Sequence, residues 1–382
     1  MRSTYGGAEK LYGQKTHPRV MLGPDEVEEL KERVLSGGGR RLMQAVRRRV
    51  RPLVEAVLQA EDLPGMVADH DRETANMGQA AVAGLQEIAI VAALDGDEDA
   101  FESARRVLLA AEAANARSRR EHYRSAVAYQ AGKFALAYDL IASRMTPGNR
   151  RAFTRWIAYQ AIPYILKCLP PNLYYRNAGA NIPFTGMVSA LSAILAVRGD
   201  PGVPAMTREV RLLLSYLQAS LNVAIGPDGY PTEDVGYGTE VAESLALVCE
   251  QLRRAGLYDV YSECPRFSRY GRALLYFVQP WGRRLSNTGD FMDYWRNREF
   301  ALTRLATETG DATLLWLVGT LGHRADYGTS PENGDRAAVD VPPSGPDWGL
   351  DEIAVNAGLR VRPTATNLYL LEEFRKPVRP AS

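Results

Sequence analysis

The sequence predicts an all-α fold, an (α/α)6 toroid of about twelve antiparallel helices, followed by a short C-terminal tail with β-strand patterns. Apolar residues recur at helical spacing in one segment after another between residues 25 and 322. Short turns rich in Gly, Asp and Pro separate these segments. The segments 74–94 and 181–198 are apolar nearly all round, which predicts an inner layer of helices behind an outer one.

The expected helices follow in chain order. The first covers 25–35, because Pro24 precedes it and Gly37–Gly39 follow it. The next covers 42–61, where Pro52 predicts a kink or a boundary. The others are expected at 74–94, 99–115, 120–143, 147–168, 181–198, 205–223, 238–256, 261–279, 298–309 and 312–322. About six antiparallel pairs with short links would close into a ring, and a straight α-solenoid is the competing architecture.

The composition changes near residue 323, so the helical domain is expected to cover residues 1–322. Residues 323–349 are rich in Gly, Pro, Asp and Ser, which is typical of a linker. Strand patterns follow at 353–361 and 366–374, in a tail too short for a sheet domain of its own.

The overall composition excludes several classes of protein. The formal net charge is +1 at pH 7, so no overall field attracts nucleic acid or a membrane surface. No apolar run reaches transmembrane length, and the first residues lack the apolar core of a secretory signal. The 3 cysteines and 4 histidines show no metal-binding or redox spacing, so no cofactor or metal is expected.

Polar and aromatic residues gather in the stretches 170–184, 226–237 and 280–297, which separate predicted helices. If the helices pair antiparallel, alternate loops lie at the same end of the fold, and these stretches meet there. The residues that they offer are Tyr175, Arg176, Asn177 and Asn181, then Tyr230, Glu233, Asp234 and Tyr237, then Trp281, Asn287, Asp290, Tyr294 and Arg296.

This mixture of side chains suits an acidic sugar polymer. Aromatic rings stack on sugars, and the guanidinium group of Arg binds a carboxylate or sulfate in a bidentate way. The chemistry that fits Tyr, Asn and Arg is β-elimination, in which the C5 proton of a uronate is removed and amides or cations stabilise the charge on its carboxylate. Tyrosine, with an ordinary pKa of about 10, becomes a base when a nearby positive charge lowers that value.

Several segments also resemble a known family in their order and spacing. They are HPRVMLGPDEVEELKERV (17–34), ALAYDLI (135–141), RNAGANIPFTGMVSALSAILAVRGD (176–200), DGYPTEDVGYGTEVAESL (228–245) and SNTGD (286–290). Each is similar to a segment of the heparinase II/III-like polysaccharide lyases. The resemblance covers roughly residues 17–320, most of the chain.

The resemblance implies a toroid followed by a β-sandwich, with a cleft between them that cleaves uronate-containing polysaccharides by elimination and needs no cofactor. It makes residues 1–322 the catalytic-type domain, and residues 323–382 the linker and start of a truncated or missing β-sandwich. A toroid tyrosine acts as acid and often as base, and an Asn, often with a His, neutralises the carboxylate.

Carried over, these roles fall on Tyr237 and Asn177, with Tyr230 and Asn181 as rivals. The residues expected to bind substrate are Arg176, Tyr175, Glu233, Trp281, Asn287, Asp290, Tyr294, Arg296 and His122.

The chain departs from the family pattern, which leaves other readings open. No histidine lies near Asn177 or Tyr237 in the sequence, although His122 is expected to reach the cleft from another helix. The chain is then a fragment, is completed by a β-sandwich domain or a second subunit, or is a non-catalytic glycan-binding toroid. A glycoside hydrolase with two carboxylates, drawn from Glu233, Asp234 and Asp290, is a further alternative.

Structural roles also explain several of these residues. Asn177 or Asn181 suits the N-cap of the helix at 181–198, and Glu233 suits the start of the next helix. Tyr237 is typical of a core position at a helix start, and turn chemistry explains Asp290.

Overall fold

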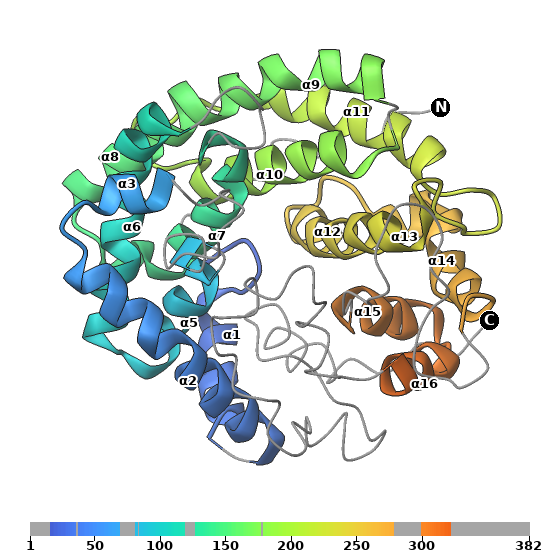
Figure 1. The fold of residues 1–382 in the computed structure, drawn as a ribbon, viewed down its shortest axis with the longest axis horizontal. Coiled ribbons are helices and arrows are strands. Elements are labelled where there is room, and N and C mark those ends of the chain that lie inside the picture. Colours follow the sequence, from blue (N-terminus) through green and yellow to red (C-terminus); the bar gives the residue numbers. More distant parts are fainter. Residues whose placement is uncertain are drawn as a thin grey trace, which may run out of the picture.

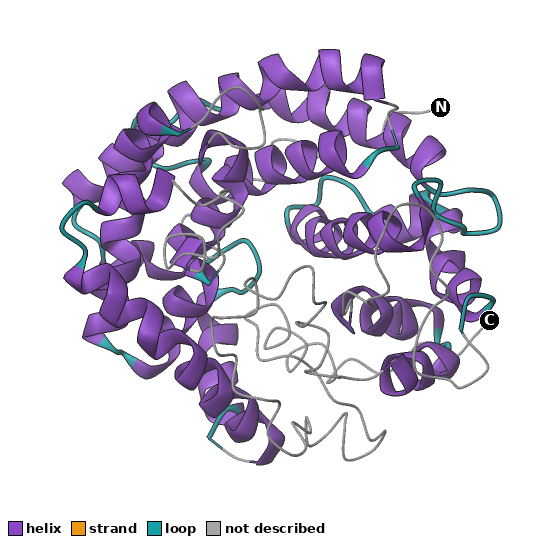
Figure 2. Ribbon diagram, viewed as in Figure 1, coloured by secondary structure: helices purple, strands orange, loops and turns teal. Residues whose placement is uncertain are grey.

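A computed structural model of the chain describes residues 16–35, 37–68, 81–82, 84–118, 127–176, 179–278 and 299–321. These residues are almost entirely helical (Figure 2), so the predicted all-α class is confirmed for them. Among them, Ile225 and Pro231 form an isolated antiparallel bridge. The predicted linker and tail lie outside the described residues. No helix in the described ranges combines the length and apolar character needed to cross a bilayer.

Most of the helices lie within or close to the predicted ranges, but the helix at Leu63–Ala68 was not predicted. The helices are α1 (Pro24–Arg33), α2 (Gly37–Gln59), α3 (Leu63–Ala68), α5 (Leu85–Asp95), α6 (Glu98–Arg117), α7 (Ala131–Ile141), α8 (Pro147–Trp156), α9 (Ile162–Arg176), α10 (Asn181–Val197), α11 (Thr207–Ala224), α12 (Asp234–Arg254), α13 (Val260–Glu263), α14 (Pro265–Leu275), α15 (Glu299–Thr309) and α16 (Ala312–Leu321). A 3-10 turn, Val127–Gln130, precedes α7, and a π-helical turn, Ile157–Ala161, joins α8 to α9.

The helices form two layers. The inner helices α5, α7, α10, α12 and α15 pack each against the next, and α6, α9, α11 and α16 pack outside them. In Figure 1 the outer helices follow one another in chain order around a curve from α2 to α16, with the inner helices inside it. Nearly every side chain of α10 is buried, as its all-round apolar sequence predicts.

Hydrogen bonds show that α7 runs parallel to α10 and that α15 runs parallel to α12. Near the start of α7, the Gly132 N–H donates to Ser189 Oγ in the first half of α10 at 2.9 Å. Near its end, Tyr138 donates to Asp200, which follows α10. The first turn of α15 likewise lies against the middle of α12, and its last turn against the end of α12. The N-terminal ends of these helices therefore share one end of the fold.

One predicted helix end at the start of the chain was wrong, and one of the two alternatives for Pro52 is excluded. Gly37–Gly39 open α2 and do not close α1, which ends at Arg33. Pro52 lies inside α2 and is no boundary. The side chain of Pro52 is exposed. Because proline has no backbone N–H, the carbonyl one turn earlier in α2 lacks its helical partner, and on this exposed face it can bind water. Buried Val50 and Leu53 on either side of it keep packing the helix against the core.

Three further corrections concern the regions around the predicted site. Helix α9 runs through Pro170 to Arg176, so Tyr175 and Arg176 lie in its last turn and not in a loop. Helix α12 starts at Asp234, which places Tyr237 in its first turn. The helix predicted at 261–279 is divided by Pro265, which cannot donate a backbone hydrogen bond, into α13 and α14.

Candidate functional site at the N-terminal end of the inner helices

The described part of the predicted site lies where α10 and α12 begin. Asn181 is the first residue of α10, and Tyr237 lies in the first turn of α12. The two helices pack against each other, and the hydrogen bond between the Asn181 N–H and Glu233 brings their starts together. Arg176 ends α9, the outer helix that leads into α10, so its backbone belongs to the same end of the fold.

Glu233 connects the two helix starts. Its Oε2 accepts a hydrogen bond from the backbone N–H of Asn181, 52 residues earlier in the chain. The N-cap of α10 is Ala180, whose side chain has no acceptor, so Asn181 is not the N-cap. Glu233 precedes α12 but makes no capping bond to it. It therefore supplies the missing acceptor for the neighbouring helix, not for its own.

The same arrangement recurs along the inner layer. Ser189 of α10 accepts the bond from Gly132 in the first turn of α7, and Glu243 of α12 accepts one from Ala301 in the first turn of α15 at 2.9 Å. A free N–H group at a buried helix start is costly to leave unpaired. Here side chains of the adjacent helices accept hydrogen bonds from these N–H groups. These bonds fix how far each helix is shifted along its axis relative to its neighbour.

Asp234 prepares the first turn of α12. Its backbone adopts φ 70, in the left-handed region that few residues other than glycine occupy. Its Oδ1 accepts a hydrogen bond from the Tyr237 N–H at 3.1 Å. The half-buried Tyr237 is thereby fixed at its backbone, directly after an unusual turn. Such backbone conformations gather at functional sites.

Tyr230, the rival tyrosine, has a different environment. It lies in a narrow hairpin closed by the bond from Gly226 N to Tyr230 O at 2.8 Å. Its ring stacks on Phe277 with centroids 5.2 Å apart. Gly229 shapes the hairpin, since its φ is 92 and a Cβ there would lie 2.6 Å from the backbone oxygen of Arg269. The ring of Tyr230 thus contributes to packing.

The remaining predicted site residues cannot be placed. Those that lie outside the described residues are Asn177, Trp281, Asn287, Asp290, Tyr294, Arg296 and His122. Tyr175 and Arg176 are described only as part of the backbone of α9.

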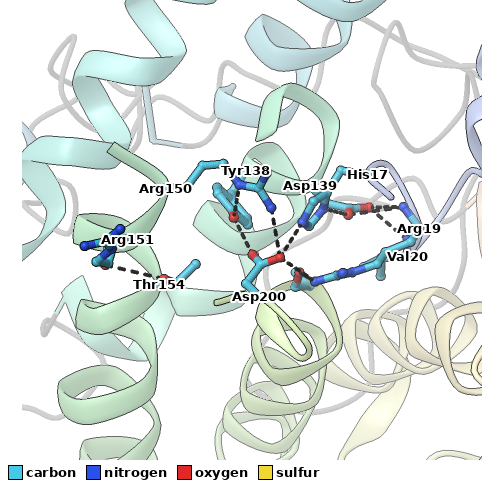
Figure 3. A network of polar contacts seen from close by, with 10 residues as sticks. His17, Arg19, Val20, Tyr138, Asp139, Arg150, Arg151, Thr154 and Asp200 are labelled. Atoms are coloured by element: carbon cyan, nitrogen blue, oxygen red, sulfur yellow. Dashed lines mark hydrogen bonds and ion pairs between the residues drawn. The ribbon is translucent and has the colours of Figure 1, made fainter. Parts of the chain in front are cut away.

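The largest polar cluster that the sequence analysis missed lies at the opposite end of α10 (Figure 3). His17 is buried between two carboxylates, with Nδ1 at 2.7 Å from Asp139 Oδ1 and Nε2 at 3.0 Å from Asp200 Oδ1. Asp139 also accepts the backbone N–H groups of Arg19 and Val20 at 2.9 and 2.8 Å. The chain segment before α1 is thereby held against the end of α7.

Asp200 gathers the rest of this cluster. It accepts hydrogen bonds from the Tyr138 hydroxyl, from Arg150 Nη2 at 3.0 Å and from Arg19 Nη2 at 3.3 Å. The same Arg19 nitrogen donates to the carbonyl of Ala196 in the last turn of α10 at 2.7 Å. The cluster thus joins the N-terminal segment, α7, α8 and the end of α10.

The electrostatic environment of this cluster stabilises the charged forms of His17 and Asp200. Burial alone lowers the pKa of His17, but hydrogen bonds to Asp139 and Asp200 outweigh it, and the pKa is raised. Burial raises the pKa of Asp200, but its bonds from His17 and Tyr138 outweigh that effect and the pKa is lowered. Burial, with the adjacent Asp200 charge, raises the pKa of Tyr138. Because both ring nitrogens lie within hydrogen-bonding distance of a carboxylate oxygen, we assign His17 as an imidazolium that donates from both nitrogens.

A signal for this cluster was present in the sequence. His17 and Arg19, Tyr138 and Asp139, and Asp200 belong to three of the segments that resemble the lyase family. They were read separately, and their convergence was not predicted. The cluster contains no metal-ligand group of the usual kind, since no set of three or more such side chains that could hold an ion occurs among the described residues.

The chemistry that the α10–α12 junction offers is a tyrosine and an asparagine in adjacent first turns, held together by a carboxylate and followed along the chain by polar-aromatic segments. No protein-family model matches the chain, and no curated protein matches it.

Proposed function

We propose that the chain is a polysaccharide lyase that cleaves uronic-acid-containing glycans by β-elimination at the N-terminal end of the inner helices. The observation that carries the proposal is the α10–α12 junction, where the Glu233 carboxylate binds the Asn181 N–H beside the helical turn that holds Tyr237. The junction brings a candidate acid and base and a candidate carboxylate-binding amide to one end of the fold.

The helical arrangement supports this reading. Parallel inner helices, each followed by an outer helix that returns the chain, are what an (α/α)6 toroid requires. The ion pair between Arg254 at the end of α12 and Glu26 in α1 connects late and early parts of the chain, as a ring does and a straight solenoid does not. We therefore propose the toroid over the solenoid.

The proposed reaction divides between two groups. Tyr237, as a phenolate, takes the C5 proton of the uronate, and the electron pair of that C–H bond forms a C4=C5 double bond. The bond between C4 and the glycosidic oxygen breaks, and that oxygen receives the proton from Tyr237. An amide, from Asn177 or its rival Asn181, donates to the uronate carboxylate where charge builds up in the transition state.

The charges at the N-terminal end of the inner helices determine which side chains substrate binding requires. Aligned helix N-termini carry partial positive charge, which favours an anionic group. Glu233 and Glu243 each accept an N–H bond there and offset part of that charge. A polyanionic substrate then needs arginine side chains as well, and we propose Arg176, whose backbone ends α9, for this role.

Hydrolysis fits the junction less well than elimination. A glycoside hydrolase needs two carboxyl groups that face the sugar. Glu233 and Asp234, the described candidates, both accept backbone hydrogen bonds, from Asn181 and from Tyr237. Their positions are accounted for by the helix starts that they hold.

The test follows the ultraviolet band of the C4=C5 double bond, which hydrolysis does not produce. Purified protein is incubated with heparan sulfate, chondroitin, hyaluronan, alginate and glucuronan. We expect wild type to generate the band on one of these polymers and Tyr237→Phe to reduce kcat by about 10²–10⁴-fold, the usual contribution of a general acid or base. Tyr159→Phe, an exposed tyrosine of the π-helical turn, is the matched control and should retain full activity.

Other outcomes would redirect the proposal. If Tyr237→Phe is active and Tyr230→Phe is not, the catalytic role belongs to Tyr230. If wild type binds a polymer but releases no unsaturated product, the chain is a glycan-binding toroid and not a lyase. New reducing ends without the ultraviolet band would establish a hydrolase.

A further inference from the structure

We infer that Glu233 is a positioning residue, which sets the height of the first turn of α10 against the first turn of α12 and so the distance between the carboxylate-binding and proton-transferring groups. The inference rests on the proposed function for its catalytic consequence. Its structural part, the tie between the two helix starts, stands on the hydrogen bond from the Asn181 N–H to the Glu233 carboxylate.

The local geometry divides two roles between Glu233 and its neighbour Asp234. Asp234, the next residue, has φ 70, and its carboxylate binds the Tyr237 N–H on α12. Glu233 instead reaches the neighbouring helix. Two adjacent carboxylates therefore hold two different helix starts, and each start carries one of the candidate catalytic residues.

Packing around the junction leaves little freedom for another arrangement. Gly238 in α12 lies so close to Pro231 that a Cβ there would overlap the proline ring. Glu233 lies on the short segment from Pro231 to Asp234, whose backbone is held by these contacts. The position of the Glu233 carboxylate is therefore restricted. A charge-assisted bond from such a fixed base is stronger than a neutral one and less tolerant of displacement.

Activity alone would not separate positioning from catalysis, so the test compares two substitutions. Glu233→Ala removes the acceptor, whereas Glu233→Gln keeps a neutral acceptor in nearly the same place. We expect Glu233→Ala to lower kcat by up to about 100-fold, the loss that a displacement of about 1 Å can cause, with a smaller change in KM. Glu233→Gln should recover most of the lost kcat.

Asp97→Ala is the matched control. Asp97 accepts the Ala100 N–H at 2.8 Å at the start of α6, so its loss also removes a carboxylate cap from a helix start. Both alanine variants should lower the melting temperature, but only Glu233→Ala should lower kcat. Equal kcat in wild type and Glu233→Ala would overturn the positioning role. Glu233→Gln as inactive as Glu233→Ala would overturn it too, because the carboxylate itself would then act on the substrate.

Hydrogen exchange measured by mass spectrometry separates this inference from the proposed function. We expect faster amide exchange in the first turn of α10, residues 181–184, in Glu233→Ala and not in Asp97→Ala. If wild type makes no unsaturated product, the proposed function fails, and this exchange difference still supports the tie between the helix starts. Unchanged exchange at residues 181–184 would overturn the tie, whatever the activity of wild type.

Discussion

The two ends of α10 are both held by carboxylates, but in different ways. At its N-terminal end, Glu233 accepts a bond from one backbone N–H, that of Asn181. At its C-terminal end, Asp200 is surrounded by His17, Tyr138 and two arginines, in a cluster that joins four parts of the chain. The first is a tie between two neighbouring helices, and the second is a buried network.

This difference indicates a division of labour along the inner helices. Removing one member of a buried network of charged groups is costly, so the cluster fixes the fold at that end. Regions that bind and release ligands belong to the less stable parts of a structure. The end with the simpler tie is also the end that carries Tyr237 and Asn181, which agrees with the proposed function.

The largest expected effect comes from breaking the buried network. Asp200→Ala leaves His17 with one of its two carboxylates and removes the carboxylate that the Arg19 guanidinium binds, in a site that solvent barely reaches. We expect the free energy of unfolding to fall by about 3–5 kcal/mol, as removal of one partner from a buried ion pair typically does. Urea denaturation at pH 7 measures this change.

The control for that experiment is an ion pair whose side chains are more exposed to solvent. Asp95 pairs with Arg47 in bidentate fashion on the outside of α5, where both side chains are partly exposed. Asp95→Ala should cost no more than about 1 kcal/mol. If Asp200→Ala costs as little as Asp95→Ala, the two ends of α10 do not differ in the way described.

A smaller effect is expected at the opposite end, from Gly238→Ala. The added Cβ overlaps the ring of Pro231, and overpacking of this kind costs about 1–3 kcal/mol. Since Gly238 follows Tyr237 directly, lyase activity should fall as well. Gly148→Ala in α8 is the matched control, because a Cβ there meets nothing within 4 Å and should be neutral or stabilise by about 0.4–1 kcal/mol. An equally tolerated Gly238→Ala would show that the junction can adjust.

The same contrast explains what the sequence could predict. Helical periodicity is local, so the all-α class and most helix ranges followed from apolar spacing. The start of α12 was missed by four residues, since 238 was expected and Asp234 is observed. Turn-forming residues in that stretch suggested a loop, and the left-handed backbone of Asp234 that begins the helix is not visible in sequence.

Contacts between distant residues were beyond local reasoning. The partners of His17 lie 122 and 183 residues away, and the residue that caps α10 lies 52 residues beyond it. His17 and Asp200 lie in two of the segments that resemble the family, but neither residue was singled out, and their contact was not predicted. Only the packing of parallel inner helices brings such residues together.

The smallest expected effect is a change in the free energy of unfolding with pH, which comes from the network around His17. The pKa of His17 is raised above its ordinary 6.5, so its contribution to stability is fully present below pH 6.5 and is lost as pH rises through the folded-state pKa. The free energy of unfolding should therefore decline above neutral pH, by at most about 1.4 kcal/mol per pH unit for one proton. The contribution of Asp200, whose pKa is lowered, is lost only in acid, below its ordinary 3.8.

A second buried network provides the internal comparison. Arg304, almost inaccessible to solvent, binds Glu250 at 2.8 Å and Glu308 at 3.1 Å between α12 and α15. Arginine keeps its proton throughout this range, so this network should not respond between pH 6 and 9. His17→Gln should then flatten the decline in stability across that range, because it removes the titrating group and leaves the arginine network in place. A stability that rises with pH, or a slope that is the same in wild type and His17→Gln, would show that His17 is not the imidazolium that holds the C-terminal end of α10.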